Sequence, residues 1–221
     1  MRLKDKVAIV TGGAYGMGES IAVLFAREGA KVLIADRLER EGREVAAGIK
    51  AAGGEAMFVR LDVTKEGRWG EVVHESVQHY GLLDILVNNA GISGAVPDRM
   101  STGYFDKLIS VNARGTFLGM KAAIPELRKA GGGSIVNLSS ISGIVGQEFV
   151  HMGYNGAKAA IRAMTKSAAV QFAKDGIRVN LRWYNHPGAP LPPIRDRCCL
   201  RRRGDFPAQM AGQAFLRVSD R

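Results

Sequence analysis

Six short apolar runs, spread over the first 180 residues, limit what this chain can fold into more than any other feature. They are rich in Val, Ile and Leu, as expected for strands buried on both faces of a parallel sheet. The runs span residues 6–11, 31–36, 56–62, 84–89, 134–140 and 177–180. Amphipathic stretches that predict helices separate them, at 16–28, 39–52, 65–80, 101–130 and 153–174. This order predicts an α/β fold, a doubly wound parallel sheet of the Rossmann type with helices on both faces.

Glycine and proline mark the expected ends of the helices. Gly29, Gly53 and Gly131 each follow a predicted helix and supply the chemistry that ends it. Pro125 lies near the end of the fourth helix, so we expect a kink or an early termination there.

The composition excludes several classes of protein. With 46% hydrophobic and 24% charged residues, the 221-residue chain is expected to be a soluble globular protein. No apolar run approaches the roughly 20 residues needed to span a bilayer, and we expect no signal peptide. The first 180 residues contain no Cys, which suits a reducing compartment and therefore a cytoplasmic location. The four His are scattered, so we expect no metal site.

The net charge of +10 raises the question of a nucleic-acid partner. Residues 1–180 carry 23 Lys and Arg against 18 Asp and Glu, and residues 181–221 carry 8 Arg against 3 Asp. Half of the excess therefore lies in the last 41 residues, and elsewhere the signs are mixed. A mixed-charge surface is typical of solubility, so we expect neither a nucleic-acid nor a membrane partner.

The composition changes abruptly at residue 181. Residues 181–221 contain five of the seven Pro and both Cys, but no Lys, Glu or Thr. We therefore expect a dinucleotide-binding domain over residues 1–180 and a divergent tail over residues 181–221.

A glycine-rich turn, TGGAYGMG over residues 11–18, follows the first predicted strand and opens the first predicted helix. Glycines at such a place let the backbone approach a pyrophosphate, whose negative charge the helix N-terminus favours. A glycine-rich turn alone is weak evidence, but this one lies in the first strand–helix unit of a doubly wound pattern, where nucleotides bind.

The residue at the end of the second predicted strand bears on the choice of nucleotide. Asp36 can accept hydrogen bonds from both ribose hydroxyls of an adenosine, and its charge would repel a 2′-phosphate. Arg37 could instead bind that phosphate. Asp36 ends the strand and precedes Arg37, and the glycine turn contains Tyr15 rather than a basic residue. NAD is therefore favoured over NADP.

Taken in order, these motifs resemble those of the short-chain dehydrogenase/reductase family, over residues 3–180. The matching elements are the TGxxxGxG spacing of the turn, NNAG at 88–91, Asn112 in VNARG, the Ser pair at 139–140 and YNGAK at 154–158. The resemblance implies an enzyme that transfers a hydride between a nicotinamide cofactor and a secondary alcohol or ketone.

In this resemblance Tyr154 is the general acid and base. Lys158 follows it by four residues, so both lie on one face of a helix. A free tyrosine has a pKa of about 10. We expect the lysine cation and the positive nicotinamide to lower the pKa of Tyr154 toward neutrality, so that it can move the alcohol proton. Lys158 is also expected to hold the cofactor ribose.

Two other residues complete the expected catalytic set. We choose Ser140 over Ser139 to orient the substrate oxygen, because it lies three residues before Gly143, as in the SxxG pattern of the family. Asn112 is expected to anchor a water that leads from Lys158 to solvent.

The resemblance also implies which residues contact the cofactor and the substrate. The expected cofactor-binding residues are Thr11, Gly12, Tyr15, Gly16, Met17, Gly18, Asp36, Arg37, Asp62, Val63, Asn89, Ala90, Gly91, Tyr154 and Lys158. Asp62 should accept from the adenine amino group, Met17 should cover the cofactor, and Asn88 should hold its strand in place. The expected substrate contacts are Ser140, Gln147 and Tyr154. His151 and Met152 are candidate selectivity residues or simple loop surface.

The tail departs from the family pattern. Pro187-Gly188 comes six residues after the sixth strand, and the Thr that normally follows to contact the nicotinamide is missing. The tail is then either a natural shortening of the substrate lobe or the product of a reading-frame change after residue 180. In both cases a lid that excludes water would be lost, so we expect NAD binding with slow turnover.

Other functions and partners stay open at this point. One alternative is a 3-oxoacyl reductase that uses NADPH, against which Asp36 argues. Another is a non-catalytic nucleotide-binding protein whose basic tail, with Arg201–Arg203, binds nucleic acid or another partner. The substrate is expected to be a small-molecule alcohol or ketone of undetermined identity.

Family members assemble through their long helices, which implies a homodimer or homotetramer. The helices concerned here are those predicted over residues 101–130 and 153–174. Small residues in the second one would permit close helix approach: Gly153, Gly156, Ala157, Ala160, Ala163, Ala168 and Ala169.

Overall fold

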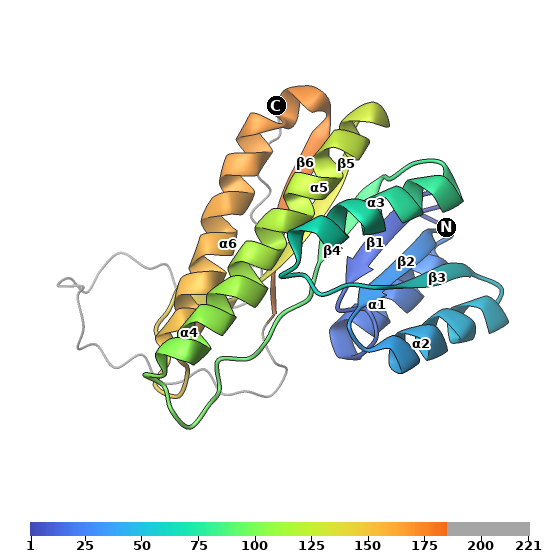
Figure 1. Ribbon diagram of the computed structural model, residues 1–221. Coiled ribbons are helices and arrows are strands. Elements are labelled where there is room, and N and C mark those ends of the chain that lie inside the picture. Colours follow the sequence, from blue (N-terminus) through green and yellow to red (C-terminus); the bar gives the residue numbers. More distant parts are fainter. Residues whose placement is uncertain (185–221) are drawn as a thin grey trace, which may run out of the picture.

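The structure is a computed structural model in which residues 1–184 are described. Their strands form one parallel sheet in the order β3-β2-β1-β4-β5-β6 (Figure 1). The strands are β1 (Val7–Thr11), β2 (Lys31–Asp36), β3 (Glu55–Arg60), β4 (Ile85–Asn88), β5 (Gly133–Ser140) and β6 (Ile177–Tyr184). Every neighbouring pair is parallel, which confirms the predicted doubly wound sheet.

The predicted helices are present, with ends within a few residues of those expected. They are α1 (Gly16–Arg27), α2 (Glu39–Ala51), α3 (Glu66–Tyr80), α4 (Thr102–Leu108), α5 (Gly115–Lys129) and α6 (Met152–Gln171). As expected from the sequence, α2 and α5 are followed by glycines in the left-handed region: φ is 82° at Gly53 and 81° at Gly131. A residue with a Cβ would be strained at either position.

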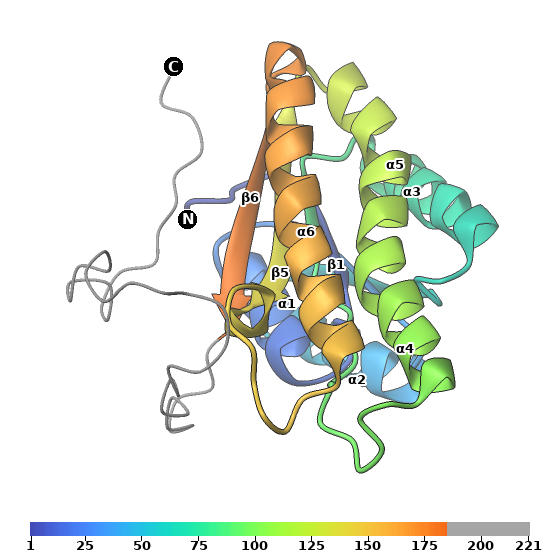
Figure 2. The same cartoon turned by 90° about the vertical axis from the view of Figure 1, so that its left-hand side faces the viewer.

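The helices cover the two faces of the sheet unequally. On one face lie α1 and α2, and on the other lie α3, α5 and α6 (Figures 1 and 2). Each face has its own apolar cluster. Ile34 and Ile49 belong to the cluster under α1 and α2, and Leu127 and Ile135 belong to the cluster under α3, α5 and α6. Burial of these side chains is what fixes the helices to the sheet.

The fourth predicted helix differs from a regular α-helix. Residues 102–129 form one continuous helical rod, but the segment Ile109–Arg114 between α4 and α5 is a π-helical turn. Such turns contain one extra residue and occur often at functional sites. The expected early termination at Pro125 is wrong: α5 continues through it to Lys129, because the missing N–H removes only one bond from a helix that is held by packing.

The sheet extends beyond the expected end of the dinucleotide-binding domain. β6 was predicted over residues 177–180, but it pairs with β5 as far as Tyr184, which lies opposite Ser140. The first four residues of the segment predicted to diverge therefore belong to the sheet. The predictions about Pro187-Gly188, the two Cys and Arg201–Arg203 lie outside the described residues.

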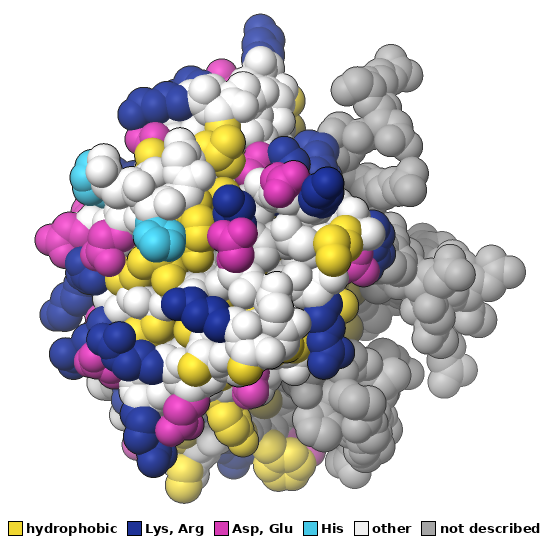
Figure 3. Space-filling view, turned by 90° about the vertical axis from the view of Figure 1, so that its right-hand side faces the viewer, with side chains coloured by type: hydrophobic (Ala, Val, Ile, Leu, Met, Phe, Trp, Pro, Cys, Tyr) yellow, Lys and Arg dark blue, Asp and Glu magenta, His cyan; other side chains and the backbone are white. Residues whose placement is uncertain are grey.

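The surface of the described residues carries both signs of charge. Figure 3 shows Lys and Arg side chains interspersed with Asp and Glu on the face that lies on the right in Figure 1. Many of these charges are paired, as in Arg43–Glu39 on α2 and Lys121–Glu66 between α5 and α3. Over residues 1–184, none of the helices has both the length and the hydropathy to cross a membrane. Within the same range, no group of three or more His, Cys, Asp and Glu side chains is placed to hold a metal ion.

Candidate active site

The glycine turn and the NNAG segment lie together at the carboxyl edge of the sheet. They follow β1 and β4, the two neighbouring strands where the strand order reverses and where ligands of such folds bind. A Cβ at Gly12 would lie 2.9 Å from the Cα of Ala90, and one at Gly18 would lie 1.9 Å from the carbonyl oxygen of Gly12. A Cβ at Gly16 would have no other atom of the described residues within 4 Å. Two glycines thus allow close backbone packing, whereas the third leaves open space above the turn.

Thr11 and Asn89 tie these two segments together. The hydroxyl of Thr11 accepts hydrogen bonds from the backbone N–H groups of Asn89 and Ala90, both at 3.0 Å. The side-chain amide of Asn89 donates back to the carbonyl oxygens of Thr11 at 2.9 Å and Gly12 at 3.2 Å. Thr11 is buried, so its part in this site is to hold the edge in shape rather than to face a ligand.

A hollow of about 410 Å³ lies along this edge and collects most of the expected cofactor-binding residues. The predicted residues that line it are Gly12, Tyr15, Gly16, Met17, Asp36, Arg37, Asp62, Val63, Asn89, Ala90 and Gly91. The other four predicted residues, Thr11, Gly18, Tyr154 and Lys158, do not line it. The open space over Gly16 and the two carboxylates fit an adenosine and its pyrophosphate, so the residues present suit a dinucleotide.

Both carboxylates of the hollow are held by hydrogen bonds within the protein. Asp36 accepts from the backbone N–H groups of Ala14 and Leu38, each at 3.1 Å. Asp62 accepts from the backbone N–H of Thr64 at 3.0 Å and from its hydroxyl at 2.8 Å. Burial raises the pKa of Asp62, but these bonds from Thr64, together with the charges of Arg37 and Lys65, outweigh it and hold the pKa below the usual range. Asp62 is therefore ionised at neutral pH.

Tyr154 and Lys158 lie on one face of α6, as their spacing predicts, and the Lys158 Nζ is 5.6 Å from the centre of the Tyr154 ring. The lysine is buried, and its ammonium donates to the carbonyl oxygen of Leu138 at 2.9 Å. A Cβ at Gly91 would lie 3.7 Å from the same Nζ. The lysine thus lies next to the end of the hollow formed by NNAG.

In the protein alone the pKa of Tyr154 is raised, so Lys158 by itself does not produce the expected fall, and the part of the prediction that depends on the nicotinamide stays a prediction. Burial raises the pKa of Tyr154, and a hydrogen bond with Ser140 lowers it only in part. Burial also lowers the pKa of Lys158, to about 8. Burial is the larger of the two effects on Tyr154, because the phenolate would lose its contact with water. Tyr154 is therefore a protonated phenol at neutral pH.

The two serines at the end of β5 have different surroundings. Ser139 is buried and donates its hydroxyl hydrogen to the carbonyl oxygen of Lys158 at 2.8 Å, on the side of α6. Ser140 lies against Tyr154, and its hydroxyl is 3.1 Å from that of Ser142. Ser142 in turn donates to the side-chain oxygen of Gln147. The geometry therefore favours Ser140 as the serine next to the reacting group. Gln147 is separated from Tyr154 by the hydroxyls of Ser140 and Ser142.

Asn112 lies in the π-helical turn and is 1% exposed. Its side-chain oxygen accepts from the backbone N–H of Ile92 at 2.8 Å, and its amide donates to the carbonyl oxygen of Ile92 at 3.1 Å. A Cβ at Gly91 would lie 2.8 Å from the same oxygen. Asn112 thus holds the loop after NNAG in place, and the expected water-anchoring role stays a proposal.

The residues just before Tyr154 in the chain differ in exposure: Phe149 and Met152 are exposed, whereas His151 is buried. Met152 is 62% exposed, and Phe149 in the preceding loop is 71% exposed. Ile144, in the same segment, is 46% exposed, so residues 144–152 carry three exposed apolar side chains shortly before Tyr154 in the chain. His151, by contrast, is 2% exposed, so it is not simple loop surface, and the protein encloses its side chain. Its ring packs between elements of the protein, because it caps α6 rather than facing the loop.

Several residues of the hollow were not predicted from the sequence. They are Ala35, Leu38, Leu61, Ile92, Lys107 and Val111. Lys107 and Val111 are four residues apart on one helical rod, so their shared face was visible in the sequence. The sequence could not predict that this face points into the hollow, because that depends on how α4 crosses the edge of the sheet.

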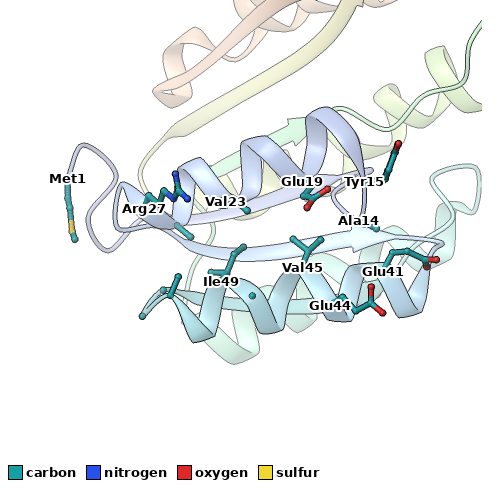
Figure 4. A pocket seen from close by; sticks show the side chains of 15 residues that line it. Met1, Ala14, Tyr15, Glu19, Val23, Arg27, Glu41, Glu44, Val45 and Ile49 are labelled. Carbon is teal, nitrogen blue, oxygen red and sulfur yellow. The ribbon is translucent and has the colours of Figure 1, made fainter.

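A second and larger hollow, of about 620 Å³, lies between α1 and α2 (Figure 4). Its lining includes Val23, Val45 and Ile49, together with Glu41 and Glu44 at its rim. Ser140, Tyr154 and Lys158 line neither hollow, but Lys158 lies next to Gly91 in the smaller one, so size alone does not identify the reactive site.

Comparison with known proteins agrees with this geometry. Residues 6–184 match the family model described as short chain dehydrogenase. A 2,5-dichloro-2,5-cyclohexadiene-1,4-diol dehydrogenase from Sphingobium indicum is 46% identical, over 81% of this chain and 72% of the relative. A 3-alpha-(or 20-beta)-hydroxysteroid dehydrogenase from Mycobacterium bovis is 43% identical, over 88% and 73%. A cyclopentanol dehydrogenase from a Comamonas species is 43% identical, over 87% and 76%.

A solved structure is similar as well. The crystal structure of a short-chain dehydrogenase/reductase from Burkholderia xenovorans superposes with a TM-score of 0.78 at 36% identity. The match covers 82% of this chain and 75% of that chain.

Proposed function

The chain belongs to the short-chain dehydrogenase family, and on that premise we propose that it is an NAD-dependent oxidoreductase for cyclic secondary alcohols and ketones. The family members named above are dehydrogenases that act on CH–OH groups, so the class of reaction follows from membership. The finer proposal is carried by one observation: Ser140, Tyr154 and Lys158 meet beside the hollow that begins at the glycine turn.

In the proposed reduction, Tyr154 Oη gives its proton to the carbonyl oxygen of the ketone as a hydride reaches the carbonyl carbon. The nicotinamide, when bound, supplies or accepts that hydride. Ser140 orients the substrate oxygen with a hydrogen bond, and Lys158 supports the phenolate that forms. In oxidation the same proton moves back to Tyr154. Because burial raises the pKa of Tyr154, the phenol is already protonated at neutral pH, which suits the reduction.

The hollow supports NAD over NADP. The carboxylate of Asp36 lines the hollow at the end of β2 and is held there by Ala14 and Leu38. A 2′-phosphate would meet this negative charge, whereas two ribose hydroxyls would find an acceptor. Arg37 and Lys107 also line the hollow, where positive charges suit the phosphate groups of a dinucleotide, and Arg37 is the residue on which the NADP alternative rests.

The substrate class is inferred from the relatives and from the segment that leads to Tyr154. Ile144, Phe149 and Met152 in this segment are exposed, and such side chains gain most from contact with an apolar ring system. The relatives are named for a cyclohexadienediol, a steroid and cyclopentanol, which are all cyclic alcohols. We therefore propose a cyclic substrate with few charged groups.

The test is hydride transfer from NADH to a cyclic ketone such as cyclohexanone, in the wild type and in Tyr154→Phe. Transfer is followed as the loss of NADH absorbance with enzyme in excess, so that slow turnover does not hide a single event. Removing the phenol should slow transfer by about 100-fold or more, since general acid catalysis is worth that much. The dissociation constant for NADH, measured by fluorescence, should change far less than the transfer rate, and NADPH should bind more weakly than NADH.

Three results would contradict the proposal in different ways. If neither dinucleotide binds, the hollow is not a coenzyme site. If NADPH binds better and a 3-oxoacyl thioester is reduced, the alternative reductase is correct. If NADH binds but Tyr154→Phe transfers hydride as fast as the wild type, the tyrosine is not the acid.

A further inference from the structure

His151 is the side-chain cap of the helix that carries Tyr154. Its Nδ1 accepts from the backbone N–H of Gly153 at 3.0 Å, at the first turn of α6. Its own backbone N–H donates to the carbonyl oxygen of Gly94 at 2.9 Å. Its carbonyl oxygen accepts from the N–H of Tyr154 at 2.9 Å. A single residue thus joins the start of α6 to the loop that follows β4.

The other ring nitrogen connects α6 to α4. Nε2 lies 3.1 Å from the carbonyl oxygen of Ser101, which can only accept, so Nε2 carries the hydrogen. Since Nδ1 must then hold a lone pair for Gly153, the imidazole is neutral. Its ring centre is 5.9 Å from that of Tyr104 and 6.3 Å from that of Phe105, both on α4.

The elements that His151 joins are also those that pack against Tyr154. A Cβ at Gly94 would lie 2.4 Å from the Cβ of Tyr154, so the loop bound by His151 touches the tyrosine directly. A Cβ at Gly153 would lie 2.9 Å from the ring of Phe105, which shows that α4 and the first turn of α6 have no spare room between them. A shift of this turn would move the phenol relative to Ser140.

We propose that His151 is a positioning residue for Tyr154, acting through the cap of α6 rather than by contact with substrate. The inference rests on the proposed function, because it assigns the support of the proposed acid. The side chain is 2% exposed, and its two ring nitrogens are held by backbone groups of Ser101 and Gly153, so neither nitrogen is left to bind the coenzyme or the substrate.

Two substitutions separate the two contacts of the ring. Asn is a preferred N-cap residue, and its side-chain oxygen can replace Nδ1, so His151→Asn keeps the bond from Gly153 and loses the one to Ser101. The carbonyl oxygen of Ser101 still accepts from the N–H of Phe105 at 2.9 Å, so little is lost. His151→Gln can reach Ser101 with its amide but leaves the buried N–H of Gly153 without its acceptor.

The measurement is the single-turnover rate of hydride transfer from NADH to cyclohexanone, with binding of NADH and of the ketone determined separately. His151→Gln should slow transfer by about tenfold to 100-fold, since small displacements of a reacting group cost that much, while both binding constants stay at the wild-type values. His151→Asn should restore most of the rate. His151→Ala also removes the acceptor for the N–H of Gly153, so it should slow transfer as His151→Gln does. It is measured instead of His151→Gln if the Gln variant does not fold.

Ile49→Val is the matched control for lost stability. Ile49 is buried under α2, far from this junction in the fold, and its truncation costs about 1 kcal/mol, similar to a lost cap. It should leave the transfer rate unchanged well below its unfolding midpoint. Equal rates in the wild type and His151→Gln would overturn the inference, and so would an equal loss in Ile49→Val. A wild type that binds no NADH or transfers no hydride would instead refute the proposed function, and this inference with it.

Discussion

At the scale of single residues, burial decides the chemistry of the site. Lys158 is 6% exposed, and the cost of removing its charge from water lowers its pKa to about 8. The same effect raises the pKa of Tyr154. Both residues were found by their spacing, but the direction of their pKa shifts depends on how deeply α6 and β5 enclose them.

Lys158 should therefore make the stability of the protein depend on pH. A solvated lysine titrates at 10.5 and the folded one at about 8, so between these values the unfolded chain binds more protons. The wild type should gain about 2 to 3 kcal/mol of unfolding free energy relative to Lys158→Met as the pH rises from about 7 to about 10. Urea unfolding of both proteins across this range measures the difference.

Lys166→Met is the control for this prediction, since Lys166 is exposed on the same helix. Its stability difference from the wild type should not change with pH. A Lys158→Met difference that is equally flat would show that the lysine is not buried in solution.

At the scale of elements, close backbone contacts set the position of α6. A Cβ at Gly143, in the short turn after β5, would lie 2.8 Å from the carbonyl carbon and oxygen of Lys158. Backbone atoms cannot rotate away as a flexible side chain can. The glycine of the SxxG pattern thus has a packing reason, because it brings the end of β5 and its serine against the helix that carries Tyr154.

Gly143→Ala should therefore push α6 away and destabilise the protein by about 1–3 kcal/mol, the usual cost of overpacking. Hydride transfer should slow as well, because Ser140 and Tyr154 lie on the two elements that separate. Gly156→Ala is the matched control on α6, where a Cβ would meet nothing, and it should stabilise by about 0.5–1 kcal/mol. Thermal unfolding of both variants and the wild type measures these stability changes. A Gly143→Ala protein as stable as the wild type would contradict the packing argument.

At the scale of the whole molecule, the outer faces of the long helices are the proposed assembly surface. Of the small residues predicted to face a partner, Gly153, Ala157 and Ala168 are buried within the protein, so they cannot do so. Gly156 and Ala163 are exposed on α6, and Phe117 is 49% exposed on the neighbouring α5. The prediction that copies pack through these helices stays open, with a smaller set of residues.

Ala163→Arg should convert a dimer or tetramer into a smaller species, because a long charged side chain would enter the helix contact. Light scattering coupled to size-exclusion chromatography measures the mass. Ala47→Arg, the same change at an exposed position of α2, should keep the wild-type mass. An Ala163→Arg protein of unchanged mass, or a monomeric wild type, would show that α6 is not the interface.

The sequence by itself determined the strand–helix order, the place of the glycine turn and the pairing of Tyr154 with Lys158. These depend on local periodicity and on spacing within one element, which a chain carries wherever it lies. Only the tertiary structure decided that Asn112 lies in a π-helical turn and clamps Ile92, that His151 points inward, and that β6 extends to Tyr184. These features depend on contacts between residues far apart in the chain, and no local pattern records how deeply a neighbouring element will enclose them.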